Sequence, residues 1–220
     1  MSSAALIVAG GASRRMGRNK LTLPWSRGSA RTVLDAVLAA TVAVADRTYV
    51  LLPPEPGADV LRVVARLPSV TAVTDALWHA GPLQAIAHGW PEVADSDEVF
   101  VAAGDLPGLQ PGALLACQAA LLAARPVCDG ATVVREGRLQ PLLACYRQRA
   151  GQAFMEVADA GEARLQPALE RLQLARVDAE AAGWPEWWTR PVHSPEDYEA
   201  WQRYTETVVD KREAGVDEGT

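Results

Sequence analysis

Short apolar runs that alternate with segments of helical spacing constrain the fold of this chain more than any other feature. Buried strands are predicted at residues 4–9, 49–52, 70–74 and 98–103. Helices are predicted between them, at residues 33–42 with Ser29 as the N-cap, at residues 58–66, and after Gly81-Pro82. Strands joined by helices favour right-handed crossovers and parallel pairing. The sequence therefore predicts a doubly wound α/β fold, with a mostly parallel sheet and helices on both faces.

The second half of the chain predicts a smaller addition to that sheet. Residues 130–134 and 139–147 have the pattern of an antiparallel pair joined by a short turn, and two amphipathic helices are expected near residues 150–158 and 164–172. Ser194-Pro195-Glu196-Asp197 has the residues that begin a helix, which we expect to continue through Trp201 and Tyr204. From about Asp210 the composition is charged, so we expect one domain over residues 1–205 and a flexible tail over residues 206–220.

Composition and charge exclude several classes of function. The net charge of -6 argues against a general nucleic-acid coat protein, which needs surplus Lys and Arg over a face. No apolar run approaches the roughly 20 residues that cross a bilayer, and the first residues lack the basic region of a signal peptide. Three widely spaced cysteines favour neither a disulfide framework nor a CxxC metal site. We therefore expect a cytoplasmic enzyme with no membrane or nucleic-acid partner.

A glycine turn followed by a cluster of cations is the strongest functional signal. After the first strand come Ala9, Gly10, Gly11, Ala12 and Ser13, whose backbone amides are expected at the carboxyl edge of the sheet. Four cations then fall within seven residues, namely Arg14, Arg15, Arg18 and Lys20. Such a loop can hold a triphosphate, with Arg15 and Lys20 neutralising its charge. The spacing matches neither GxGxxG, which argues against a dinucleotide-binding oxidoreductase, nor the Walker pattern, since Leu21 follows Lys20.

The segment LIVAGGASRRMGRNKLTLPW resembles the signature LAGGxSxRMGxxKxxLP of the nucleotidyltransferases similar to molybdenum cofactor guanylyltransferase, the MobA-like NTP transferases. The resemblance implies a Rossmann-like domain of GT-A type, in which this loop wraps the nucleotide and a small antiparallel extension faces the acceptor. In the family, AGG marks the guanylyl branch and AAG the cytidylyl branch. Ala9-Gly10-Gly11 therefore favours GTP over CTP.

Two carboxylates follow predicted strands at the same sheet edge. Asp105 comes after the strand at residues 98–103, in a GDLP stretch similar to that of the family, whose Asp binds magnesium. Mg²⁺ prefers one or two carboxylates completed by phosphate oxygens and water, so Asp105 meets the minimum requirement. Asp75 ends the strand at residues 70–74, and the resemblance implies that it contacts the nucleoside; a capping Asp is a nearly equal alternative.

The acceptor side departs from the family pattern. The segment VHSPEDY stands where the family has VNTPEDL, so His193 replaces Asn, and Pro191 occupies a second Asn position. An imidazole can bind a metal or a phosphate, which makes His193 a second metal-ligand candidate, although it can equally serve as a solvent-side cap. Trp184, Trp187, Trp188 and Trp201 offer either a stacking surface for a pterin or ordinary core packing.

Together these features predict transfer of GMP from Mg-GTP to a molybdopterin-type phosphate, with Lys20, Asp105 and Arg15 in the catalytic machinery and a molybdoenzyme or chaperone as a transient partner. Three alternatives remain. A CTP-using cytidylyltransferase is the nearest, a transferase acting on a phosphorylated sugar or organic acid is the second, and a non-catalytic nucleotide-binding accessory protein is the third.

Overall fold

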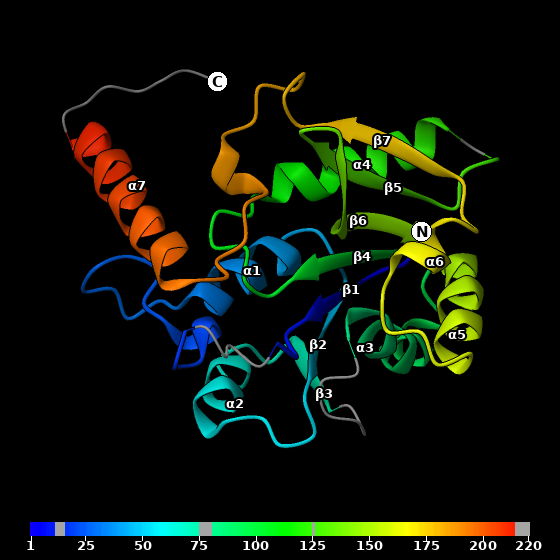
Figure 1. The fold of residues 1–220 in the computed structure, drawn as a ribbon, viewed down its shortest axis with the longest axis horizontal. Coiled ribbons are helices and arrows are strands. Elements are labelled where there is room, and N and C mark those ends of the chain that lie inside the picture. Colours follow the sequence, from blue (N-terminus) through cyan, green and yellow to red (C-terminus); the bar gives the residue numbers. More distant parts are fainter. Residues whose placement is uncertain (12–15, 75–80, 125, 214–220) are drawn as a thin grey trace.

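The computed structural model describes residues 1–11, 16–74, 81–124 and 126–213, with side chains as far as residue 208. Seven strands form one sheet in the order β3-β2-β1-β4-β6-β5-β7 (Figure 1). Their bounds are β1 Ser3–Val8, β2 Arg47–Leu52, β3 Val70–Thr74, β4 Glu98–Ala103, β5 Gly130–Arg135, β6 Arg138–Arg147 and β7 Leu174–Asp178. β6 pairs antiparallel with β4 and with β5, whereas the other pairings are parallel. The predicted α/β class and mostly parallel sheet are confirmed.

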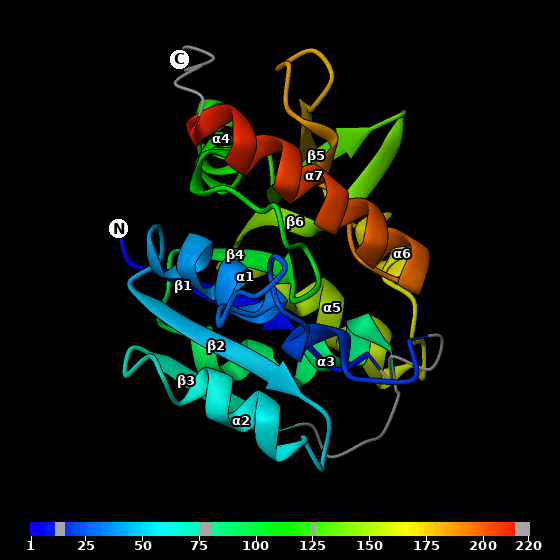
Figure 2. The same cartoon turned by 90° about the vertical axis from the view of Figure 1, so that its left-hand side faces the viewer.

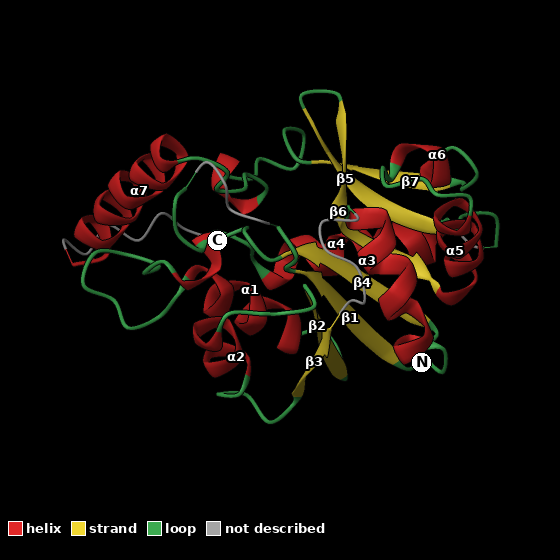
Figure 3. Cartoon of the chain, turned by 60° about the horizontal axis from the view of Figure 1, so that its bottom comes forward, coloured by secondary structure: helices red, strands yellow, loops and turns green. Residues whose placement is uncertain are grey.

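Helices cover both faces of this sheet (Figure 3). Their bounds are α1 Val33–Val42, α2 Ala58–Val64, α3 Pro82–Gly89, α4 Pro111–Ala123, α5 Gly151–Asp159, α6 Gln166–Leu169 and α7 Pro195–Glu213. The side chains of β1 alternate between two cores, because Ala5 and Ile7 pack with α1, α2 and α4, whereas Ala4 and Leu6 pack with α3, α5 and α6. Burial on both faces explains why the parallel strands are continuous apolar runs.

Several local predictions needed correction. The N-cap of α1 is Thr32 rather than Ser29: the Thr32 hydroxyl accepts from the Asp35 amide, and the Asp35 carboxylate accepts from the Thr32 amide. The helix expected at residues 164–172 is the single turn α6, since the chain must leave the helix to pair as β7. β7 and α4 were not predicted. The solvent side of α4 carries Leu115 and Leu122, which hides its helical pattern.

The last helix continues beyond the domain boundary placed at residue 205. α7 extends to Glu213. Figure 1 shows it at the left side of the molecule, and in Figure 2, where that side faces the viewer, it lies in front of the sheet. Residues 214–220 lie outside the described part of the chain, so the flexible tail stays a prediction. None of the described helices has the length and apolar character needed to cross a membrane.

Candidate functional site

The carboxyl ends of β1 and β4 lie side by side and open on one edge of the sheet. Val8 pairs with Ala103 in the parallel ladder, and the Gly104 amide donates to the Val8 carbonyl at 2.9 Å. On the other side, the Ala9 amide donates to the Leu51 carbonyl at 2.9 Å. The glycine turn after β1 and the acidic turn after β4 therefore leave the sheet at the same place, as the sequence predicts.

Lys20 reaches this edge from a short 3₁₀ turn, η1 (Lys20–Thr22). The Asn19 side chain accepts from the Leu21 amide at 3.0 Å and caps the turn. The Leu21 side chain is buried against Gly104, where an added Cβ would lie 3.3 Å from it. With its neighbours anchored in this way, Lys20 forms an ion pair with Asp105 through Nζ and Oδ2.

Asp105 is a buried carboxylate whose charge is compensated locally. Its side chain is 8% exposed, and that of Lys20 is 13% exposed. Burial pushes the pKa of Asp105 upward, but the hydrogen bond from His193 and the charge and hydrogen bond of Lys20 outweigh burial, so the pKa lies below its usual value. Asp105 is therefore ionised at neutral pH and available to a cation.

His193 completes this group from the other side of the site. Its Nδ1 lies 3.2 Å from Asp105 Oδ2 and 3.3 Å from Lys20 Nζ. Because an ammonium only donates and a carboxylate only accepts, Nδ1 serves one of these partners at a time. The main chain beside it is fixed, since the Val192 amide donates to the Asp105 carbonyl at 2.9 Å and the His193 amide donates to Asp197 at 3.1 Å.

A cavity of about 830 Å³ joins these parts. Its walls include the glycine turn, the ends of β2 and β4, the start of α3, part of β6 and the segment before α7. The lining residues that bear on function are Ala9, Gly10, Gly11, Lys20, Pro53, Gly81, Pro82, Asp105, Gln140, Leu165, Thr189, Pro191 and His193. Asp105 is the only carboxylate among the described residues that line the cavity. The volume is that of a small-molecule site.

Four of the predicted site residues, Ala12, Ser13, Arg15 and Asp75, lie outside the described residues. The described ones, Ala9, Gly10, Gly11, Lys20, Asp105 and His193, come together at one cavity. The prediction omitted Thr189 and Leu165, which also line the cavity. Neither carries a sequence signal, because each reaches the cavity through an irregular connection.

Trp25 links the two turns that carry Lys20 and Asp105. Its indole N–H donates to the Pro107 carbonyl at 2.7 Å, two residues after Asp105. α7 in turn holds Trp25, because Trp201 Nε1 donates to the Trp25 carbonyl at 2.5 Å and Tyr198 donates to the Pro24 carbonyl at 2.8 Å. The C-terminal helix is therefore connected to the site through Trp25, as well as through Asp197, which accepts from the His193 amide.

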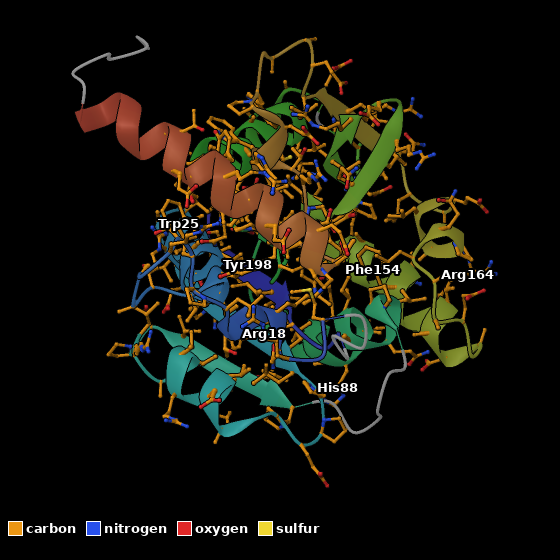
Figure 4. The ribbon with its side chains drawn as sticks, turned by 60° about the vertical axis from the view of Figure 1, so that its left-hand side comes forward. Arg18, Trp25, His88, Phe154, Arg164 and Tyr198 are labelled. Atoms are coloured by element: carbon orange, nitrogen blue, oxygen red, sulfur yellow. The ribbon has the colours of Figure 1, made fainter. Side chains whose placement is uncertain are left out.

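Two features of the sequence lie elsewhere than expected. Arg18 does not line this cavity, and its guanidinium lies 5.8 Å from the centre of the Tyr198 ring on α7 (Figure 4). The four late tryptophans do not line it either. Trp187 and Trp201 are buried in an aromatic cluster under α7, and Trp184 and Trp188 pack against the main core. Core packing accounts for these rings.

This geometry agrees with the comparison of the chain with known families. A family model described as the MobA-like NTP transferase domain matches residues 5–177. The chain belongs to this family. The MobA-like domain contains the glycine turn, Lys20 and Asp105, whereas Thr189, His193 and α7 follow it in the sequence.

A curated sequence relative resembles about half of the chain. A protein of Mycolicibacterium paratuberculosis named "Probable molybdenum cofactor guanylyltransferase" is 37% identical over 113 residues, which cover 50% of this chain and 53% of that protein. The chain thus spans about half the length of the curated relatives it matches.

Among solved structures, molybdopterin-guanine dinucleotide biosynthesis protein A of Archaeoglobus fulgidus superposes with a TM-score of 0.72 at 18% identity, covering 93% of this chain and 99% of that chain. The 4-diphosphocytidyl-2C-methyl-D-erythritol synthase of Anaerococcus prevotii gives 0.69 at 11% identity, covering 93% and 96%. At these identities the similarity concerns the fold.

Proposed function

We propose that this protein transfers GMP from Mg-GTP to the phosphate of a molybdopterin-type acceptor and releases pyrophosphate. The observation that carries the proposal is the meeting of Gly10, Gly11, Lys20 and Asp105 at one cavity, in a chain of the MobA-like family. The named activities of the curated relatives support the choice of reaction. Handing the product to a molybdoenzyme or a chaperone is part of the same proposal.

The residues present fit a magnesium ion delivered with the nucleotide. Within the described residues there is no group of three or more His, Cys, Asp or Glu side chains that could hold a metal ion. Asp105 alone supplies a buried, ionised oxygen ligand, and the Lys20 ammonium already lies against it as a cation. Mg²⁺ takes one or two carboxylates with phosphate oxygens and water, so Asp105 would hold it together with a triphosphate. When bound, the ion supplies charge neutralisation on the phosphates.

The chain's own groups can then act by positioning and electrostatics. A phosphate monoester is already anionic near neutral pH, so the acceptor needs no dedicated base. Lys20, released from Asp105 when a cation replaces it, can donate to a phosphate oxygen. The amides after β1 can donate to others. The arrangement favours in-line attack of the acceptor phosphate on the α-phosphorus.

The preference for GTP is part of the proposal and rests on Ala9-Gly10-Gly11. Among the described residues, an added Cβ at Gly10 would have no neighbour within 4 Å, and at Gly11 it would meet only Lys20 Cε at 3.9 Å. Neither glycine has a positive φ. The described part of the protein therefore leaves room for a larger side chain at both positions. This supports the interpretation that glycine stands there because a ligand comes close to the backbone. The guanylyl pattern AGG then favours GTP.

Product mass tests this proposal. The full chain is incubated with molybdopterin, Mg²⁺ and GTP, CTP or ATP in parallel, and pyrophosphate release is recorded. We expect a guanine dinucleotide product with GTP and little turnover with the others. A cytidylyl product contradicts the base assignment. Nucleotide binding without pyrophosphate release, with molybdopterin and with phosphorylated sugars alike, contradicts the enzymatic proposal and supports an accessory role.

A further inference from the structure

Asp105 and His193 bring an oxygen and a nitrogen ligand atom together in the site. Asp105 Oδ2 and His193 Nδ1 lie 3.2 Å apart, and both residues line the cavity of about 830 Å³, the main cavity of the described residues. Nitrogen and oxygen ligands at about 2.0–2.2 Å from one ion lie roughly 2.9–3.5 Å apart in octahedral or tetrahedral geometry. The separation of the two atoms therefore already suits two ligands of a single ion.

The Lys20 ammonium marks where a cation lies against this pair. Its Nζ forms the ion pair with Asp105 Oδ2 and lies 3.3 Å from His193 Nδ1. Because an ammonium only donates, Nδ1 meets it with the lone pair through which a neutral imidazole binds metals. Both ligand atoms therefore face one positive charge. Lys20 has a long flexible stem, so its ammonium can move aside when a divalent ion enters.

The main chain holds the two ligand residues beside each other. The Val192 amide donates to the Asp105 carbonyl at 2.9 Å, and the Asp197 carboxylate accepts from the amides of His193 at 3.1 Å and Ser194 at 3.0 Å. Ligands held in this way lose little conformational freedom when they bind an ion. The His193 side chain is 57% exposed, so an ion can reach its ring.

The nitrogen donor changes which ion this pair prefers. The sequence pattern that the chain resembles has Asn in place of His193, and a carboxamide offers an oxygen to a metal. Mg²⁺ prefers oxygen ligands, whereas imidazole favours borderline ions such as Co²⁺ and Zn²⁺. His193 therefore shifts the preference of the site away from Mg²⁺.

We propose that Asp105 and His193 form a mixed oxygen and nitrogen site that binds a borderline divalent ion, of the class of Co²⁺ and Zn²⁺, more tightly than Mg²⁺ and without a nucleotide. The proposed function assigns Mg²⁺ to the same carboxylate, so the role of the ion in transfer rests on that function. The binding itself rests on the two ligand atoms and the cation between them.

The test is a titration of the full chain with Co²⁺, without nucleotide or acceptor, followed by visible absorption and with Mg²⁺ as competitor. We expect one Co²⁺ per chain, bound about tenfold or more tightly than Mg²⁺. His193→Asn should weaken Co²⁺ binding about tenfold or more and change the affinity for Mg²⁺ less than about threefold. Asp105→Asn should weaken the binding of both ions, since both use the carboxylate.

His88→Asn is the matched control, because it removes an exposed histidine of α3 that does not line the main cavity. It should bind Co²⁺ like the parent chain, and thermal unfolding should show that all variants are folded. Equal Co²⁺ affinity of the parent chain and His193→Asn overturns the inference. Equal weakening by His88→Asn and His193→Asn also overturns it, because the ion then binds histidine without selecting the site.

The outcomes distinguish this inference from the proposed function. Transfer from Mg-GTP by a chain that does not bind Co²⁺ at His193 overturns the inference and leaves the function standing. Selective Co²⁺ binding by a chain that transfers no nucleotide supports the inference and contradicts the function. Where transfer occurs, Co²⁺ should reach its half-maximal effect at about tenfold lower concentration than Mg²⁺, and His193→Asn should remove that difference.

Discussion

The two rims of the main cavity are built in different ways. The rim proposed to bind the nucleotide, with Gly10, Gly11 and Asp105, lies at the ends of parallel strands that are hydrogen-bonded on both sides and belong to the MobA-like domain. We call it the nucleotide rim. The opposite rim, with Pro191 and His193, lies in an irregular segment that follows the domain and is joined to the turn of Asp105 by the hydrogen bond from the Val192 amide. The topology thus fixes the charge-handling groups, whereas the acceptor wall can change without disturbing the sheet.

Asp105→Asn removes the negative charge of the nucleotide rim and should have the largest effect on the rate of transfer. We expect loss of transfer by about 10³-fold, because the one carboxylate lining the described cavity can no longer hold a divalent cation. Asp97→Asn is the matched control, since Asp97 is an exposed carboxylate just before the opposite end of β4. Steady-state pyrophosphate release measures both. Full activity of Asp105→Asn would contradict the assignment of Asp105 as the carboxylate that holds the cation.

Lys20→Ala tests the contribution of the ammonium group that lies beside Asp105 at the same rim. The change removes the ammonium that would donate to the triphosphate, so KM for GTP should rise about 10- to 100-fold with a smaller fall in kcat. KM for the acceptor should change less than KM for GTP. A drop confined to kcat would mean that Lys20 acts only in the transition state, and an unchanged KM for GTP would remove it from nucleotide binding.

Trp25→Phe tests whether α7 sets the geometry of the nucleotide rim. The substitution keeps an aromatic ring and removes the hydrogen bond to the Pro107 carbonyl, so kcat/KM should fall about five- to tenfold. Trp90→Phe serves as a control, because it removes a similar indole bond to the Gln148 carbonyl at 3.0 Å, away from the main cavity. Trp25→Phe should lose about 1 kcal/mol of stability by thermal unfolding. Trp90→Phe should lose more, because Trp90 is fully buried and the smaller ring leaves a cavity. Equal activities of Trp25→Phe and Trp90→Phe would show that α7 does not influence catalysis through Trp25.

Asp197→Asn probes the opposite rim, the segment with Pro191 and His193 that precedes α7. Burial raises the pKa of Asp197, but hydrogen bonds from Arg190, His193 and Ser194 outweigh it, so the folded pKa lies below the usual value. Its stabilisation is therefore present above the unfolded pKa, near 3.9, and is lost as pH falls through the folded pKa. At neutral pH the substitution should cost about 1–2 kcal/mol of unfolding free energy.

Denaturant unfolding at several pH values checks this prediction. The difference between the parent chain and Asp197→Asn should shrink only below about pH 4. A difference that grows as the pH falls has the wrong sign and contradicts the assigned role of the carboxylate. The catalytic constants for GTP should be nearly unchanged, since Asp197 lies on the acceptor side of the site.

The same contrast explains what could be predicted from the sequence. Residues 99–103 of β4 are apolar throughout, and a parallel strand ends at the ligand edge, so the position of Asp105 followed from local pattern and topology together. The contact between Arg18 and Tyr198 could not be predicted in this way, because it forms only through the packing of α7. β7 was missed since an edge strand with half-buried residues shows no clear alternation.

The most direct test is a structure of the chain with Mg²⁺ and a non-hydrolysable GTP analogue. The account predicts that the triphosphate lies along the turn at Gly10 and Gly11, with the ion about 2.0–2.1 Å from an Asp105 oxygen and the Lys20 ammonium transferred to a phosphate. A triphosphate bound away from this edge, or an ion held without Asp105, would contradict it.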